Sequence, residues 1–139
     1  MSREIKFRAW DRQEKKMHEV LSIHLRREKV IISNKPFGNV PLWDYDLMQY
    51  TGLKDKNGKE IYEGDIIKSE WQYDGVINRD ITSVGQVAFG GNDGEPGFFM
   101  YGKDGDIYQP FVSYDRVELL SVEVIGNIYE NPELLKEGN

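Results

Sequence analysis

His18 and His24 are the two side chains of this 139-residue chain best suited to acid–base chemistry or to metal binding at neutral pH. Either role would require a histidine to converge with a carboxylate. The two histidines lie in a turn-rich region and do not form a ligand spacing such as His-x-x-x-His. The pattern therefore favours a surface or packing role, and we expect neither a catalytic nor a metal-binding histidine.

Acidic side chains gather in two glycine-rich loops, one with Asp93 and Glu95 and one with Asp104 and Asp106. Such loops can hold Ca²⁺ through carboxylate oxygens. The Asp-x-Asp-x-Asp-Gly pattern of a calcium loop is missing, however, and Asp-Gly is common in hairpin turns. The loop that starts at Gly90 is not followed by Gly-Lys-Ser/Thr, and its acidic residues would repel phosphate. We expect turns at both places, with no metal and no cofactor.

Nucleophilic catalysis finds no support in the sequence. There is no cysteine, which excludes thiolate nucleophiles, thiolate metal sites and disulfides. No serine stands in a Gly-x-Ser-x-Gly elbow. Since no set of catalytic residues can be assembled, we expect that the protein is not an enzyme.

Aromatic side chains could form a binding face or fill the core. Phe98 and Phe99 fall in an apolar run typical of a strand that is covered on both sides, which favours packing. Two further aromatic residues lie in a polar segment, and the sequence leaves both packing and binding open for them. A polar turn after His24 adds two arginines. The predicted partner-binding residues are therefore Trp71, Tyr73, Arg26 and Arg27.

The charge divides unevenly along the chain. Residues 1–46 carry 10 Lys and Arg against 7 Asp and Glu, a net charge of +3, whereas residues 47–139 carry 8 against 17, a net charge of −9. The acidic second part repels phosphate, so nucleic acid is a disfavoured partner. Nucleic acid stays open as the alternative partner, through eight basic residues of the first part, which are Lys6, Arg8, Arg12, Lys15, Lys16, Arg26, Arg27 and Lys29.

The first part of the chain reads as a small β lobe. Alternating apolar and polar residues predict a half-buried strand at Ile5–Trp10, and Met17–Leu21 could return as the second strand of a hairpin. Ser33–Pro41 has the composition of a loop. We therefore expect an N-terminal β-hairpin lobe with its linker over residues 1–46, and a main domain over residues 47–139.

The main domain begins with three turn signals between apolar runs, which are Thr51-Gly52, Asn57-Gly58 and Glu63-Gly64-Asp65. We expect Gly64 to take a conformation that disfavours a Cβ. Asn-Gly is a strong hairpin signal because both residues accept a positive φ. Short strands separated by glycine-rich turns predict a mainly β fold, and about five strands fit a small closed barrel better than a sandwich. Asn131 as N-cap and Pro132 at the first helical position predict a short C-terminal helical turn.

Composition places the chain among folded proteins rather than disordered ones, with 39% hydrophobic and 30% charged residues. No apolar run approaches the roughly 20 residues of a membrane span. No apolar signal-peptide core follows Met1–Glu4. We expect a protein of the cytoplasm that does not enter the membrane.

Three blocks of sequence, Ile5–Asp11, Met48–Ile67 and Ile125–Pro132, carry a resemblance to a known family. With them the chain resembles the YopX family of small proteins, which phages and prophages of bacteria encode. The resemblance implies an SH3-like β-barrel over the second part of the chain and self-association into a homo-oligomer, for example a trimer. It implies no catalytic residues.

Taken together, these observations favour a non-catalytic protein-interaction module. Its expected place is the cytoplasm of the bacterial host, and its expected partner is a host or phage protein. The alternative is a nucleic-acid-binding barrel that uses the basic N-terminal lobe.

Overall fold

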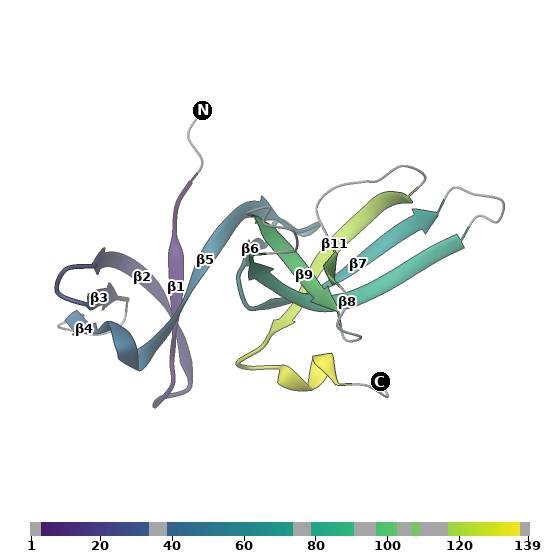
Figure 1. Cartoon of the computed structure of the whole chain (residues 1–139). Helices are drawn as coiled ribbons and strands as arrows, with labels where there is room; N and C mark the ends of the chain where they lie inside the picture. The colour runs from purple at the N-terminus through teal and green to yellow at the C-terminus, as the bar shows by residue number, and fades with distance from the viewer. Residues whose placement is uncertain are drawn as a thin grey trace. The chain divides into compact units, whose positions relative to one another are not determined.

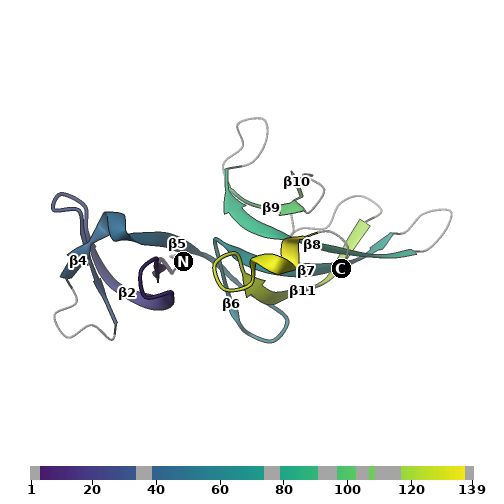
Figure 2. The ribbon, with the colours of Figure 1, turned by 90° about the horizontal axis from the view of Figure 1, so that it is seen from below.

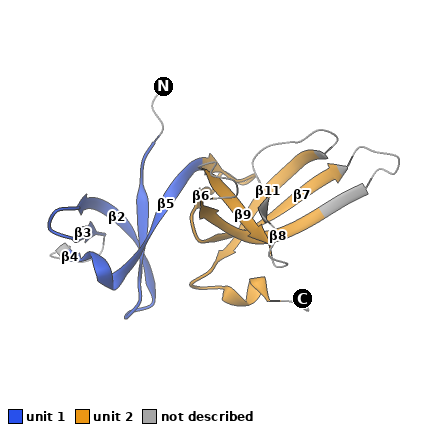
Figure 3. Cartoon of the chain, viewed as in Figure 1, with its two compact units in different colours: residues 1–52 blue, residues 53–139 orange. Residues whose placement is uncertain are grey.

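The computed structural model of the chain describes residues 4–33, 39–73, 79–90, 97–102, 107–108 and 117–136 (Figure 1). The predicted loops around Gly38, Asp93 and Asp104 lie outside these residues. The described chain is mainly β, as the sequence predicted, and forms two antiparallel sheets. It divides into two compact units, unit 1 with residues 1–52 and unit 2 with residues 53–139 (Figure 3).

Unit 1 is built on an antiparallel sheet with the strand order β4-β3-β2-β1-β5, and β5 then continues to its neighbour β6. A short 3-10 helix, η1, precedes β5. The elements of this part of the chain are β1 (Phe7–Asp11), β2 (Lys16–His24), β3 (Lys29–Ile32), β4 (Asn39–Pro41), η1 (Leu42–Asp44), β5 (Tyr45–Lys54) and β6 (Glu60–Tyr62), of which β6 belongs to unit 2. The predicted hairpin is therefore present as β1 and β2, and the lobe has further strands beside it.

The core of unit 1 contains four buried side chains, Ala9, Val30, Ile32 and Tyr45, with partly buried apolar residues packed against them. Ile5 does not share this burial, because the sheet pairing of β1 starts only at Phe7 and leaves Ile5 66% exposed. The predicted start of the first strand at Ile5 is thus wrong by two residues.

Two four-residue turns connect the first three strands of unit 1. Lys15 closes the β1–β2 turn and Glu28 closes the β2–β3 turn, with φ angles of 59° and 53°. These are the only described residues other than glycine with a positive φ. A register shift between Val20 and Ser22 makes Leu21 a bulge residue in β2. The two turns place short polar segments at the ends of the sheet.

Unit 2 is built on a five-stranded antiparallel sheet with the order β10-β9-β8-β7-β11. β7, β8 and β11 run side by side (Figures 1 and 2). Within the described residues the sheet is open, with β10 and β11 at its edges, whereas the sequence predicted a closed barrel. The elements are β7 (Asp65–Tyr73), β8 (Arg79–Phe89), β9 (Phe98–Gly102), β10 (Ile107–Tyr108), β11 (Val117–Asn127) and the 3-10 helix η2 (Pro132–Leu135).

The core of unit 2 joins the five-stranded sheet to the β5–β6 hairpin. Ile61 of β6 is buried together with residues of β7, β8, β9 and β11, which are Ile67, Val87, Met100 and Val122. At about 25 cal/mol per Å² of apolar surface, burial of such side chains stabilises the unit by roughly 1.5–3 kcal/mol each. In the described residues no helix is both long and apolar enough to cross a membrane.

Asp55 organises the loop between β5 and β6. Its Oδ1 accepts backbone hydrogen bonds from Asn57 and Lys59, both at 2.9 Å, and its Oδ2 accepts one from Val124 of β11 at 2.9 Å. The hairpin predicted at Asn57-Gly58 is present between β5 and β6; Gly58 has a φ of 83°, whereas Asn57 is not among the described residues with a positive φ. The hydrogen bonds to the Asp55 carboxylate hold the loop between β5 and β6 in its conformation.

The electrostatics of Asp55 follow from these contacts. Burial alone would raise the pKa of its carboxyl group. The backbone N–H groups of Val124, Lys59 and Asn57, and the charge of Lys59, outweigh this effect and hold the pKa below its usual value. The ionised carboxylate is therefore part of the folded state.

Gly64 occupies the turn between β6 and β7 and is buried, with a φ of 83°. Its N–H donates to the Val87 carbonyl at 2.8 Å, and its carbonyl accepts from Ile128 N–H at 2.9 Å. The backbone of this one residue thus bonds to β8 and to the segment after β11. The prediction that Gly64 adopts a conformation unfavourable for a Cβ is confirmed.

The C-terminal end forms the single helical turn that the sequence predicted, with Pro132 at its start. Asn131 does not cap it with its side chain; Oδ1 accepts instead from Asn127 N–H at 3.2 Å. The pairing of β11 with β7 has a register shift between Val124 and Gly126. A Cβ at Gly126 would come within 2.7 Å of Asn131 Oδ1, so this packing requires glycine.

We predict that Gly64→Val lowers the free energy of unfolding by about 1–3 kcal/mol, because a β-branched residue resists a positive φ. Urea denaturation measures the loss. Gly58→Val measures the cost of the backbone conformation alone, since Gly58 has the same φ of 83° but is exposed and a Cβ there meets nothing within 4 Å; the buried Gly64→Val should lose at least as much stability. An unchanged midpoint for Gly64→Val would contradict the role assigned to this turn.

We predict that Asp55→Asn destabilises the protein at neutral pH by roughly 1–3 kcal/mol, because an amide N–H₂ cannot accept the Val124 hydrogen bond. The wild-type carboxyl has a lowered pKa, so its contribution is complete above the unfolded value of about 3.9 and is lost as the pH falls through the folded pKa. The difference between the two proteins should therefore shrink in acid.

Urea denaturation at a series of pH values measures this difference for Asp55→Asn. Glu118→Gln, at an exposed position of β11, serves as the control and should show no comparable trend. A stability difference for Asp55→Asn that stays constant from neutral pH into acid would disprove the assignment.

Candidate functional site

The predicted partner-binding residues fall in different units. Arg26 and Arg27 are exposed in the β2–β3 turn of unit 1. Trp71 lies on β7 of unit 2 and is only 5% exposed, so its ring is packed inside the unit. The side chain of Tyr73 is outside the described part of the structure. The arginines are thus the predicted residues that the structure places at a surface.

Other aromatic side chains of unit 2 divide between core and surface. Phe99 is buried and Phe98 packs against the core, as the sequence predicted. Phe89 is 55% exposed and meets Phe98 edge to face, with ring centroids 5.3 Å apart. The sequence did not single out Phe89, because the alternation of residues along a strand does not show which side chains near its end stay exposed.

A mixed apolar and basic surface lies at the β2–β3 turn of unit 1. Leu25 in this turn is 78% exposed, and Trp43 of η1 is 61% exposed. The Leu42 N–H donates to the Glu28 carbonyl at 2.8 Å, which holds η1 against the turn. We define the hairpin-tip surface as Leu25, Arg26, Arg27 and Trp43.

Several basic residues of the first part are engaged within unit 1. Lys6 Nζ lies 3.1 Å from Glu4 and 5.4 Å from the centre of the Tyr50 ring. Arg8 Nε donates to Met48 Sδ at 3.4 Å. Side chains held in these contacts are less available to form the row of basic residues that a nucleic-acid surface would need.

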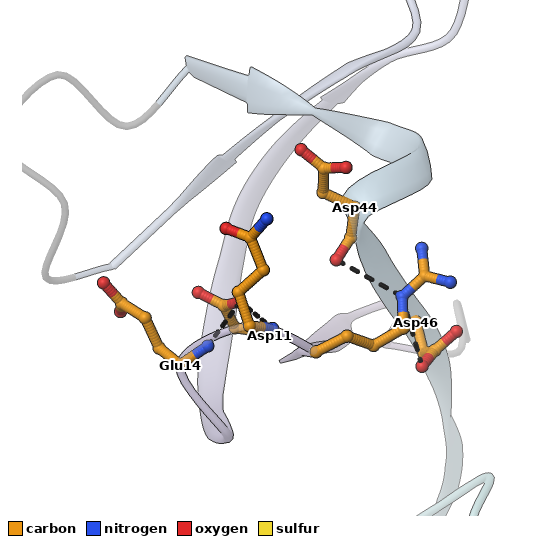
Figure 4. Close-up of polar contacts among 6 residues, drawn as sticks. Asp11, Glu14, Asp44 and Asp46 are labelled. Carbon is orange, nitrogen blue, oxygen red and sulfur yellow. Dashed lines mark hydrogen bonds and ion pairs between the residues drawn. The ribbon is translucent and has the colours of Figure 1, made fainter.

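Arg12 also makes contacts within unit 1. Its Nε lies 3.4 Å from the Asp44 carbonyl and 3.9 Å from Asp46 Oδ2 (Figure 4). Asp44 ends η1 and Asp46 lies at the start of β5. The guanidinium therefore joins the β1–β2 turn to β5 by contacts on the surface, which contribute little to stability.

Three metal-ligating side chains converge at the β1–β2 hairpin. Asp11, Glu14 and His18 each offer one ligand atom, and these atoms all lie within 4.8 Å of one another. Asp11 and His18 are 4% and 6% exposed, and Glu14 is exposed. The sequence predicted no metal-binding histidine, because the spacing Asp-x-x-Glu-x-x-x-His has no meaning until the hairpin register is known.

The hairpin register explains the convergence. Ala9 pairs with His18 and Asp11 with Lys16, so Asp11 and His18 are diagonal neighbours on adjacent strands. Asp11 Oδ1 accepts from the backbone N–H groups of Gln13 and Glu14, at 2.9 and 3.1 Å. These bonds hold the backbone of Glu14 beside the Asp11 carboxylate (Figure 4).

Comparison with known proteins agrees with this architecture. The family model described as YopX protein matches residues 6–136. The crystal structure of protein EF1440 from Enterococcus faecalis is similar, with 33% sequence identity and a TM-score of 0.57, over 97% of this chain and 100% of that chain. No curated protein matches the sequence at a significant level.

Proposed function

The chain belongs to the YopX protein family, and on this premise we propose that it is a non-catalytic protein-interaction module. The observation that carries the proposal is the exposure of Leu25 next to Arg26 and Arg27 in one turn, together with the exposure of Trp43 on η1, which a backbone hydrogen bond from Leu42 joins to this turn. Exposed apolar side chains that cluster mark interaction sites. Tryptophan and arginine are the residue types that most often dominate the binding energy of protein interfaces.

The proposal also includes the fold type of unit 2 and the place where the protein acts. We propose that unit 2 is a variant of the SH3-like barrel, supported by its five antiparallel strands and by the two register shifts in β11, which bend a sheet. The resemblance to proteins of phages and prophages supports an accessory role in the cytoplasm of a bacterial host.

A nucleic-acid-binding role is the second candidate. Arg26 and Arg27 favour it, because they are adjacent and exposed in one turn. The pairing of Lys6 and Arg12 with carboxylates opposes it, as does the net charge of −9 over residues 47–139. We therefore rank a protein partner first.

We predict that the immobilised full chain retains a host or phage protein from a lysate of host cells, and that Leu25→Ser combined with Trp43→Ser abolishes this retention. Loss of such anchors costs roughly 2 kcal/mol or more in binding free energy. Leu120→Ser is the matched control, since Leu120 is 48% exposed on unit 2. Mass spectrometry of the retained proteins, quantified for the three baits, measures the effect.

Two outcomes would count against this proposal. If all three baits retained the same proteins, the hairpin-tip surface would not be the binding site. Fluorescence anisotropy with duplex and single-stranded oligonucleotides tests the second candidate. Sub-micromolar binding at about 200 mM salt, lost on Arg26→Ala with Arg27→Ala, would replace the protein partner with a nucleic acid.

We also predict that the protein self-associates at high micromolar concentration, as the family resemblance implies, and that the hairpin-tip variant weakens this association. Apolar anchors that self-complement across a symmetry axis would give a closed oligomer. Sedimentation velocity over a concentration series measures it, again with Leu120→Ser as control. Sedimentation of the wild-type chain as a monomer at every concentration would exclude self-association.

A further inference from the structure

The β1–β2 hairpin carries a cluster of ligating side chains that the proposed interaction does not use. It consists of Asp11, Glu14 and His18, with one ligand atom of each within 4.8 Å of the others. We propose that these three residues bind a divalent transition-metal ion of the Zn²⁺ type. The inference rests on a buried histidine nitrogen, on the fixed orientation of the ligands and on their charge.

The imidazole of His18 is the central observation. Its Nδ1 lies 3.2 Å from the Ser33 carbonyl oxygen, which can only accept, so Nδ1 carries the hydrogen. In the neutral ring Nε2 then presents a lone pair. Nε2 is buried, and no described group forms a hydrogen bond with it. A buried polar atom without a partner is costly, and a metal ion would satisfy this one.

The same contact is typical of a metal-binding histidine. Ligating histidines usually donate their second ring nitrogen to a carbonyl or carboxylate, which fixes the tautomer and the ring orientation. The Tyr45 ring also packs edge-on against the His18 ring, with centroids 6.3 Å apart. The orientation and the tautomer of the ring are thus constrained before any ion arrives.

Asp11 is held as firmly as His18. Two backbone N–H groups of the turn donate to its Oδ1, and the Tyr45 hydroxyl donates to its Oδ2 at 3.3 Å. Metal-ligating carboxylates are commonly hydrogen-bonded in this way. Tyr45 therefore contacts two of the three proposed ligands and positions them relative to each other.

The charge of the cluster suits a divalent cation. Asp11 and Glu14 supply two negative charges, and His18 in its neutral form adds none. Of the neighbouring cations, Arg12 contacts Asp44 and Asp46 (Figure 4), and Lys15 and Lys16 are exposed. An ion at this place would neutralise two carboxylates that otherwise repel each other.

The ligand types select the class of metal. Zn²⁺ accepts imidazole nitrogen and carboxylate oxygen together and takes three protein ligands with a water in its fourth position. Mg²⁺ and Ca²⁺ prefer all-oxygen sets. A site with one nitrogen and two carboxylates thus favours Zn²⁺ over the hard ions, and Glu14 is the exposed ligand through which the ion would enter.

We test the site by isothermal titration of the untagged full chain with ZnCl₂ at neutral pH. We expect one ion per chain with micromolar affinity and no binding of Mg²⁺ under the same conditions. His18→Gln and Glu14→Gln should each weaken binding about tenfold or more. His24→Gln is the matched control, because His24 is an exposed residue of the same strand and its affinity should equal that of the wild type.

The opposite outcomes overturn the proposal. These are the lack of saturable Zn²⁺ binding by the wild type, unchanged affinity in His18→Gln or Glu14→Gln, an equal loss in His24→Gln, or equal binding of Mg²⁺. Glu14 lies in an exposed loop, so Glu14→Gln remains informative even where His18→Gln fails to fold.

A measurement on the unsubstituted protein completes the test. Long-range proton–nitrogen correlation spectra report the tautomer of each histidine. We expect His18 in the Nδ1–H form, with its Nε2 resonance shifted by Zn²⁺ and the His24 resonances unmoved. A Zn²⁺ response confined to His24 would disprove the assignment.

Discussion

The carboxylate of Asp55 is the interaction on which the rest of unit 2 depends. It satisfies two backbone donors of its own loop and a third in β11, 69 positions along the chain. Lys56 N–H adds a bond to the Val122 carbonyl at 2.9 Å beside it. Because an ionised group that is buried must find all its partners, this loop fits only one placement of β11.

Further backbone and amide contacts extend this arrangement. Gly64 bonds to β8 and to Ile128, and Asp65 Oδ2 accepts the Tyr62 N–H at 2.8 Å. Asn127 Oδ1 accepts from the backbone of Tyr129 and Glu130. The blocks of sequence that carry the family resemblance therefore hold turns and strand ends in place. They explain a shared fold without implying a shared reaction.

The sequence was sufficient for features that depend on local chemistry. Positive φ at Gly64, the hairpin near Gly58 and the turn at Pro132 were all predicted, because each follows from the residue itself. Features that depend on the register of the strands were not predicted. Burial of Trp71, the convergence of Asp11 with His18 and the exposure of Trp43 require knowing which strand lies beside which. An open sheet was missed for the same reason, since strand number does not determine closure.

The strand β5 has a consequence for how this chain can be divided. Its ten residues, Tyr45–Lys54, contain the boundary between the two units, so the chain passes from one to the other inside a paired strand. Paired backbone is a poor substrate for proteases, which cleave exposed and locally unfolded segments. A truncation at residue 52 would sever a strand and leave an unpaired edge on what remains. Gene fusion or domain shuffling at this point would be selected against, and the two units should be inherited together.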